Sequence, residues 1–219
     1  RLSVGIEDLG PVAFGAELAN AVTGLRVTDN GSGAGNNTAT ETLSQVVLVI
    51  PADTATLTHT ITDTAGNPIG TQSGVGSAQI AFNAGTRTYT ITSTIITGAP
   101  DVALLSQTDR AQAEADIRAT LALFRVEVGP THTDQNTTIG VAATALDVNN
   151  GIAHTLNTSF DHTIRIQAVA DTPSIVTSAS APVAEDSLMA LFINAGRSAD
   201  QDGSESLSVR ITVPTDAQG

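Results

Sequence analysis

The chain has 219 residues, which is long enough to bury a core. Because 41% of the residues are hydrophobic but only 3% are aromatic, we expect Val, Ile, Leu and Ala to build this core. The formal net charge is −13, and all nine basic residues are arginine, which excludes the basic patches that nucleic acids and anionic membranes attract. There is no cysteine, which excludes disulfides and thiolate metal sites.

Short runs of alternating apolar and polar residues, bounded by Gly, Asn, Asp and Pro, recur along the chain and predict strands. The alternation is clearest at residues 56–61 (TLTHTI) and 89–92 (YTIT). Such spacing is typical of an all-β, antiparallel sandwich. The expected strands are residues 25–28, 43–50, 55–62, 78–82, 87–96, 121–128, 137–146 and 163–170.

Residues 106–120 (SQTDRAQAEADIRAT) break this pattern. Ser106 and Asp109 have the spacing of a helix N-terminal cap, and Ala113, Ile117 and Leu121 fall on one helical face. This segment therefore predicts one short helical insert that crosses between strands.

An internal repeat divides the chain. The pair Glu7–Asp8 recurs as Glu185–Asp186, and the block ETLS that begins at Glu41 recurs in the same order as ESLS. A proline in the sequence ADTP interrupts strand pairing between the two copies. We therefore expect a β-sandwich repeat module at residues 1–171, a Pro-containing linker at 172–173, and the N-terminal part of a second, incomplete repeat module at 174–219.

Carboxylates gather around the expected junction. Residues 200–205 (DQDGSE) place three of them around a glycine, and calcium prefers six to eight oxygen ligands. A solvated Asp-Gly turn is the alternative interpretation. Residues 147–150 (DVNN) are a further candidate, for which a plain turn is favoured. The predicted metal ligands are Asp171, Glu185, Asp186, Asp200, Asp202 and Glu205 at the junction, and Glu7, Asp8, Asp29 and Glu41 in the first module.

Three segments together carry a family resemblance: residues 163–173 (TIRIQAVADTP), 184–186 (AED) and 200–208 (DQDGSESLS). They resemble the tandem repeats of giant RTX-type bacterial adhesins, which are immunoglobulin-like or cadherin-like extender domains exported by type I secretion. The resemblance is specific over residues 163–211, weaker at 5–50, and only general in between. It implies an extracellular cell-surface location, a role in cell adhesion and biofilms, neighbouring repeat modules as partners, and Ca²⁺ that stiffens the linkers.

Catalytic motifs are lacking. None of the four histidines, His59, His132, His154 and His162, has the spacing of a zinc-protease motif, and Ser159 near Asp161–His162 lies in no nucleophile elbow. Alternation along a strand explains these residues better than an active site, so the sequence does not predict an enzyme.

Two other functions remain open beside the extender. One is a module that binds a glycan or a host protein, with residues 29–40 and 106–120 as the expected contact regions. The other is a strand-exchanging subunit of a surface filament, in which residues 188–213 complete a neighbour's sheet.

Overall fold

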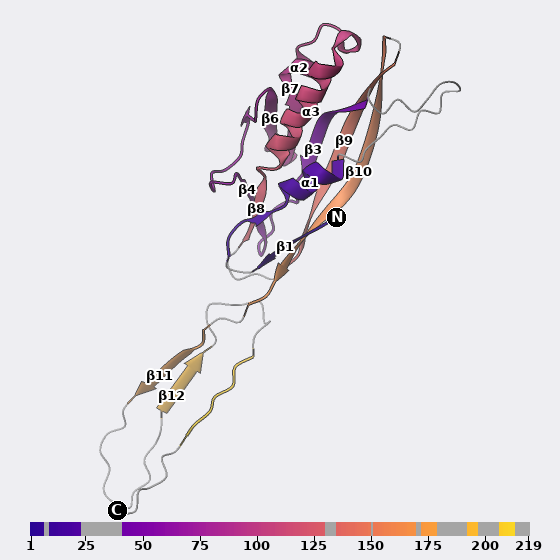
Figure 1. The fold of residues 1–219 in the computed structure, drawn as a ribbon. Coiled ribbons are helices and arrows are strands. Elements are labelled where there is room, and N and C mark those ends of the chain that lie inside the picture. The colour runs from indigo at the N-terminus through magenta and orange to yellow at the C-terminus, as the bar shows by residue number, and fades with distance from the viewer. Residues whose placement is uncertain are drawn as a thin grey trace, which may run out of the picture.

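The computed structural model describes residues 1–6, 9–22, 41–129, 135–149, 151–169, 172–178, 192–196 and 206–212. A seven-stranded sheet forms the main layer, in the order β1-β10-β9-β3-β7-β6-β5 (Figure 1). Neighbouring strands run antiparallel except β1 and β10, which are parallel. The strands are β1 (Leu2–Ile6), β3 (Glu41–Val49), β5 (Gln72–Ser73), β6 (Ala78–Asn83), β7 (Thr88–Ser93), β9 (Thr137–Asn149) and β10 (Ile152–Gln167).

A smaller sheet and the helices form the second layer. The small sheet has the order β2-β8-β4 and consists of β2 (Val12–Ala13), β8 (Arg125–Gly129) and β4 (Thr58–Thr62). The helical elements are α1 (Gly15–Val22), α2 (Thr94–Thr97), the 3₁₀ turn η1 (Val102–Leu104) and α3 (Gln107–Leu121). Figure 1 shows α3 lying along one face of the large sheet and α1 across the lower part of the same face.

The core lies between these two layers. It is mainly aliphatic, as expected, but aromatic rings occupy its centre, which the expectation of a purely aliphatic core missed. Phe14 meets Phe124 edge to face with ring centroids 6.4 Å apart, and Tyr89 meets Phe124 in the same way at 5.7 Å. Fully buried residues come from both layers: Leu18, Val46, Leu48, Ile91, Ile117, Leu121, Val126, Ile139 and Ile164.

The approach of α1 to the end of α3 requires a glycine. Gly15 donates its N–H to the Phe124 carbonyl at 3.1 Å. A Cβ at this position would lie 1.8 Å from the Leu121 carbonyl oxygen, so any side chain would push the two helices apart. The start of α1 can therefore pack directly against the turn that leads from α3 into β8.

The predicted helix at residues 106–120 is confirmed as α3. Ser106 accepts a hydrogen bond from the Asp109 N–H at 3.1 Å, as a capping residue does, and Ala113, Ile117 and Leu121 are fully buried. The prediction of a single helical insert is wrong, because α1 and α2 are also present. The chain is thus β-rich rather than all-β, since helices supply part of the second layer.

The strand predictions succeed in the middle of the large sheet. Residues 43–50, 78–82 and 137–146 correspond to β3, β6 and β9. The predicted strand at 87–96 ends early because the Ser93 hydroxyl accepts the Ile95 N–H and starts α2. The predicted strand at 25–28 lies outside the described residues.

Two strand boundaries were wrong for local reasons. The strand expected at 121–128 begins only at Arg125, because Leu121 ends α3. The strand expected at 55–62 begins at Thr58, because the Thr54 hydroxyl accepts the Leu57 N–H at 2.9 Å and holds a turn before it. The strand expected at 163–170 is the last part of a much longer β10 that begins at Ile152.

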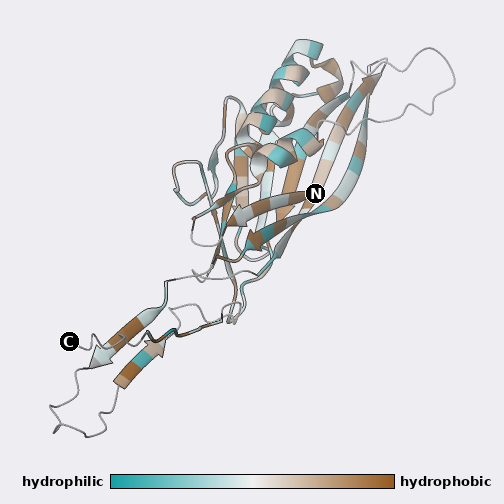
Figure 2. Cartoon of the chain, turned by 60° about the horizontal axis from the view of Figure 1, so that its bottom comes forward, coloured by the Kyte–Doolittle hydropathy of each residue, from teal (hydrophilic) through white to brown (hydrophobic). Residues whose placement is uncertain are grey.

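A separate hairpin follows the position of Pro173. Strands β11 (Ser174–Ser178) and β12 (Phe192–Gly196) pair with each other and with no other described strand. Figure 2 shows hydrophobic residues on both of these strands, outside the two main layers. Ile175, Val176 and Phe192 are each about three-fifths exposed, at 61%, 63% and 59%. The described residues of this hairpin therefore contribute nothing to the main core.

Candidate functional site

Most of the predicted calcium ligands fall where the structure gives no description. Glu7, Asp8, Asp29, Asp171, Glu185, Asp186, Asp200, Asp202 and Glu205 all lie outside the described residues. Only Glu41 has a described position, at the start of β3.

Glu41 stands directly opposite Asp147 of β9. Residues opposite each other in an antiparallel pair project to the same face, so two carboxylates adjoin at this end of the sheet. Their oxygens suit calcium, but a calcium site needs six to eight oxygens, and the rest of such a shell would have to come from outside the described ranges. Within those ranges, no group of three or more His, Asp or Glu side chains is placed to hold a metal ion.

The interpretation of residues 147–150 as a plain turn is wrong for Asp147. This residue lies within β9, is only 3% exposed and also pairs with His154 of β10. The hairpin register pairs Asn149 with Ile152, so the reversal of the chain comes after Asn149, where Gly151 has a φ of +76°.

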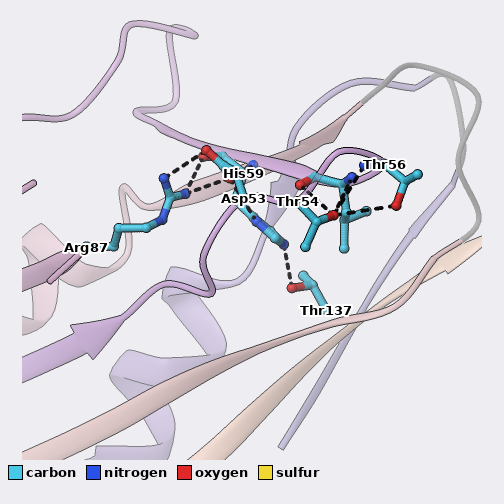
Figure 3. Close-up of polar contacts among 7 residues, drawn as sticks. Asp53, Thr54, Thr56, His59, Arg87 and Thr137 are labelled. Atoms are coloured by element: carbon cyan, nitrogen blue, oxygen red, sulfur yellow. Dashed lines mark hydrogen bonds and ion pairs between the residues drawn. The ribbon is translucent and has the colours of Figure 1, made fainter. Parts of the chain in front are cut away.

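A polar cluster in the described part joins the two sheets (Figure 3). It consists of Asp53, which follows β3, His59 of β4, Arg87, which precedes β7, and Thr137 of β9. Arg87 donates to both oxygens of Asp53 at 2.9 Å. The His59 N–H also donates to Asp53 at 2.9 Å, and Arg87 donates to the His59 carbonyl at 3.1 Å.

The two ring nitrogens of His59 have different partners. Nδ1 lies 3.3 Å from Asp53 Oδ1, and Nε2 lies 2.7 Å from the Thr137 hydroxyl. A carboxylate only accepts, so the network assigns the ring proton to Nδ1, and Nε2 then accepts the hydroxyl proton. Burial lowers the pKa of His59, although Asp53 opposes the shift, and the neutral ring that results matches this assignment.

The pKa of Asp53 is also shifted. Its partial burial raises the pKa, but hydrogen bonds from His59 and the charge of Arg87 outweigh that effect and leave the pKa below its usual value. Asp53 is therefore a carboxylate at any pH above the ordinary aspartate pKa of 3.8.

A hydroxyl, an imidazole and a carboxylate in this order resemble the triad of a hydrolase. Here the His59 side chain is 1% exposed and Thr137 is 5% exposed, so a substrate has no route to the hydroxyl in this conformation. The arrangement suits a polar link between β4 and β9.

A second buried histidine ties β1, α1 and β10 together. Ser3 of β1 donates to Glu17 of α1 at 2.7 Å, and its oxygen lies 2.9 Å from Nε2 of His162 on β10. His162 is fully buried, and burial lowers its pKa against the opposing charge of Glu17. Ser159 and Asp161 are exposed while His162 is buried, so strand alternation separates them, as the sequence predicted.

A third cluster fixes the β5–β6 connection to α3. Asp116 accepts from the Ser77 N–H at 2.8 Å, from the Ser77 hydroxyl at 2.6 Å and from Gln112 at 2.8 Å. These hydrogen bonds, those of Ser77 first, lower the pKa of Asp116. Gly76 has a φ of +58°, and a Cβ there would lie 2.5 Å from Asp116, so the connection needs glycine at this position.

Comparison with known proteins gives no relative: no family model, no curated protein and no solved structure matches the chain. Among the described helices, none is long and apolar enough to cross a membrane.

Proposed function

We propose that the chain is a structural extender and adhesion module of a large bacterial surface adhesin, stiffened by calcium at its module junctions. The observation that carries this proposal is the hairpin β11–β12, which begins directly after Pro173 and pairs only with itself among the described strands. Domain boundaries often fall in proline-containing linkers, so a new pairing unit directly after a proline fits a junction in a tandem array.

The terminal strands of the first unit suit a load-bearing role. β1 runs parallel to β10, with Leu2 beside Thr163 and Ile6 beside Gln167. A force that pulls residue 1 and the end of β10 in opposite directions would slide these strands along each other and load the whole ladder at once. Strands that peel apart would break their hydrogen bonds one at a time and would resist less.

The immunoglobulin/cadherin-like sandwich belongs to the proposal as well. Its support is a core enclosed by two sheets, with Val126 of β8 buried in the same cluster as Ile139 of β9. Helices α1 and α3 would mark a specialised version of such a module.

Calcium enters the proposal through charge. The chain carries a net charge of −13, and the sequence concentrates carboxylates at residues 171–205. Carboxylates brought within a few ångströms of one another repel, and a divalent cation converts that repulsion into a crosslink. Junction carboxylates bridged in this way would hold successive modules in line on the bacterial cell surface.

Thermal unfolding and solution scattering of the chain, with calcium and with excess EDTA, test this role. Calcium should raise the melting temperature and lengthen the particle, because an ion that binds only the folded state stabilises it. The double variant Asp200→Asn/Asp202→Asn should lose most of both effects. Asp101→Asn, whose residue caps η1, is the matched control and should respond like the parent chain. Identical melting curves with calcium and with EDTA would refute the calcium site.

A further inference from the structure

Among the strands that the structure describes, the long strand β10 has a partner on only one side over more than half of its length, which leaves an open edge. It pairs with β9 from Ile152 to Ile164, but with β1 only from Thr163 onward. No described strand pairs with the other side of β10 between Ile152 and His162.

The direction of the free backbone groups follows from the ladder. The Thr163 N–H donates to the Arg1 carbonyl at 2.9 Å. The backbone N–H and C=O groups of the odd-numbered residues of β10 therefore point away from β9. The register with β9 is unbroken over Ile152–Ile164, so the same alternation holds above Thr163. Ala153, Thr155, Asn157 and Ser159 therefore present N–H and C=O groups at the open edge.

This edge lacks the usual protection against strand addition. Edge strands are normally guarded by charged residues, proline or bulges. Residues 152–160 (IAHTLNTSF) contain no Asp, Glu, Lys, Arg, Gly or Pro. Ile152 and Leu156 are 58% and 43% exposed, so apolar surface accompanies the free backbone.

The same chain also carries a segment with strand character that pairs with none of the described strands. Residues 206–212 (SLSVRIT) alternate apolar and polar residues, and Leu207, Val209 and Ile211 are 38%, 48% and 59% exposed. The described residues give this segment no ladder partner, and Figure 1 shows it as an extended yellow trace beside the hairpin.

We propose that residues 206–212 of one copy of this chain add as a strand to the open edge of β10 in a second copy. The added strand runs parallel to β10, as β1 does on the same side, with Leu207, Val209 and Ile211 beside the even-numbered residues of β10, whose side chains face the second layer. In a parallel pair this register turns the N–H groups of Leu207, Val209 and Ile211 toward β10. Arg210 then lies on the opposite face, where the nearest charge on β10 is the carboxylate of Asp161. Backbone hydrogen bonds supply the affinity, as in other cases of strand addition.

The position of the donor favours a second copy over the same molecule. Figure 1 places the hairpin and residues 206–212 beyond the C-terminal end of β10, whereas the open edge begins at its N-terminal residue, Ile152. Donor and open edge thus lie at opposite ends of the molecule, so the contact joins two copies head to tail and propagates as a linear chain. This inference does not depend on the adhesin proposal, since it needs neither calcium nor a bacterial surface.

Light scattering on fractionated protein at rising concentration tests the inference, at an ionic strength high enough to screen the net negative charge. The parent chain should grow in mass with concentration. Val209→Pro blocks the donor, and Thr155→Pro blocks the edge by removing an outward N–H without removing a bond to β9. Each variant alone should be monomeric, whereas Ser208→Ala and Thr155→Val should associate like the parent.

A mixture of the two proline variants gives the sharpest result. The Val209→Pro chain keeps an intact edge and the Thr155→Pro chain keeps an intact donor, so the mixture should form a one-to-one pair and nothing larger. Hydrogen exchange should show new protection at Thr155 and Asn157 on association. A parent chain that stays monomeric at all concentrations would overturn the inference, as would a Val209→Pro chain that associates normally or a mixture that forms no pair.

Discussion

The contact between the Thr137 hydroxyl and the His59 ring joins the two sheets at a point where both side chains are buried. Thr137→Val keeps the shape of the side chain but leaves Nε2 of His59 without a donor. A buried polar atom that loses its partner costs about 1–3 kcal/mol. Denaturant unfolding should show a loss of that size, whereas the neighbouring exposed change Thr138→Val should have little effect. Equal stability of the two variants would mean that the link does not contribute.

The two buried histidines should make stability depend on pH. Burial lowers the pKa of His59 and of His162 below the ordinary value of 6.5, so the unfolded chain takes up protons first as the pH falls. Their contribution is complete above pH 6.5 and is lost as the pH falls from there through the folded-state pKa values, with a slope of about 1.4 kcal/mol per pH unit for each proton. The lowered carboxyl pKa values act only at more acidic pH.

This pH dependence is measured by denaturant unfolding between neutral pH and about pH 5. The parent chain should lose stability steadily over that interval. His162→Gln should be less stable at neutral pH but should show a smaller slope, because one proton-binding group has been removed. The exposed change His154→Gln serves as the control. A parent chain with no slope would show that the two rings already bind protons in the folded state.

At the scale of elements, α3 does more than cover the large sheet. Asp116 holds the connection between β5 and β6 through Ser77. Asp116→Ala should cost about 2–3 kcal/mol, since hydrogen bonds to a charged acceptor are lost and the Ser77 N–H is left unpaired. Hydrogen exchange should then rise at Ser77, while the exposed change Glu127→Ala should alter neither stability nor exchange. A variant that keeps its protection at Ser77 would contradict this role.

Local signals explain which elements the sequence could predict. Helix α3 has its cap, its apolar face and its end within one short segment, so the prediction was correct. The first half of β10 was missed because residues 152–161 are exposed or half-buried on both faces and give little apolar alternation. Helix α1 was missed because it is short and is held mainly by its contacts with α3 and with the turn that follows α3.

The polar clusters depend on residues that are far apart in the sequence. Ser3 and His162 are separated by 159 positions, and His59 and Thr137 by 78. No spacing motif connects such residues, because only the sheet register brings them together. The Glu41–Asp147 pair is a similar case, since the sequence proposed both residues for different loops and the ladder made them neighbours.

For the whole molecule, the described core belongs to one part of the chain. Every residue of the buried cluster lies between Val12 and Ile166. An isolated two-stranded hairpin is marginally stable in water, so β11–β12 cannot be a major source of stability for that core. Removal of residues 172–219 should therefore change the melting temperature of the remaining unit by no more than about 2 °C. Such a change corresponds to less than about 1 kcal/mol in the free energy of unfolding.

Calorimetry of the two chains measures this, in EDTA so that metal binding does not contribute. Both samples must be dilute, because the shorter chain also lacks the proposed donor strand and any association would raise the melting temperature of the full chain alone. A fall of more than about 5 °C on truncation, which exceeds what about 1 kcal/mol produces in a chain of this size, would show that the C-terminal segment packs on the first unit. Agreement within the narrower limit would establish residues 1–171 as an independently folding module.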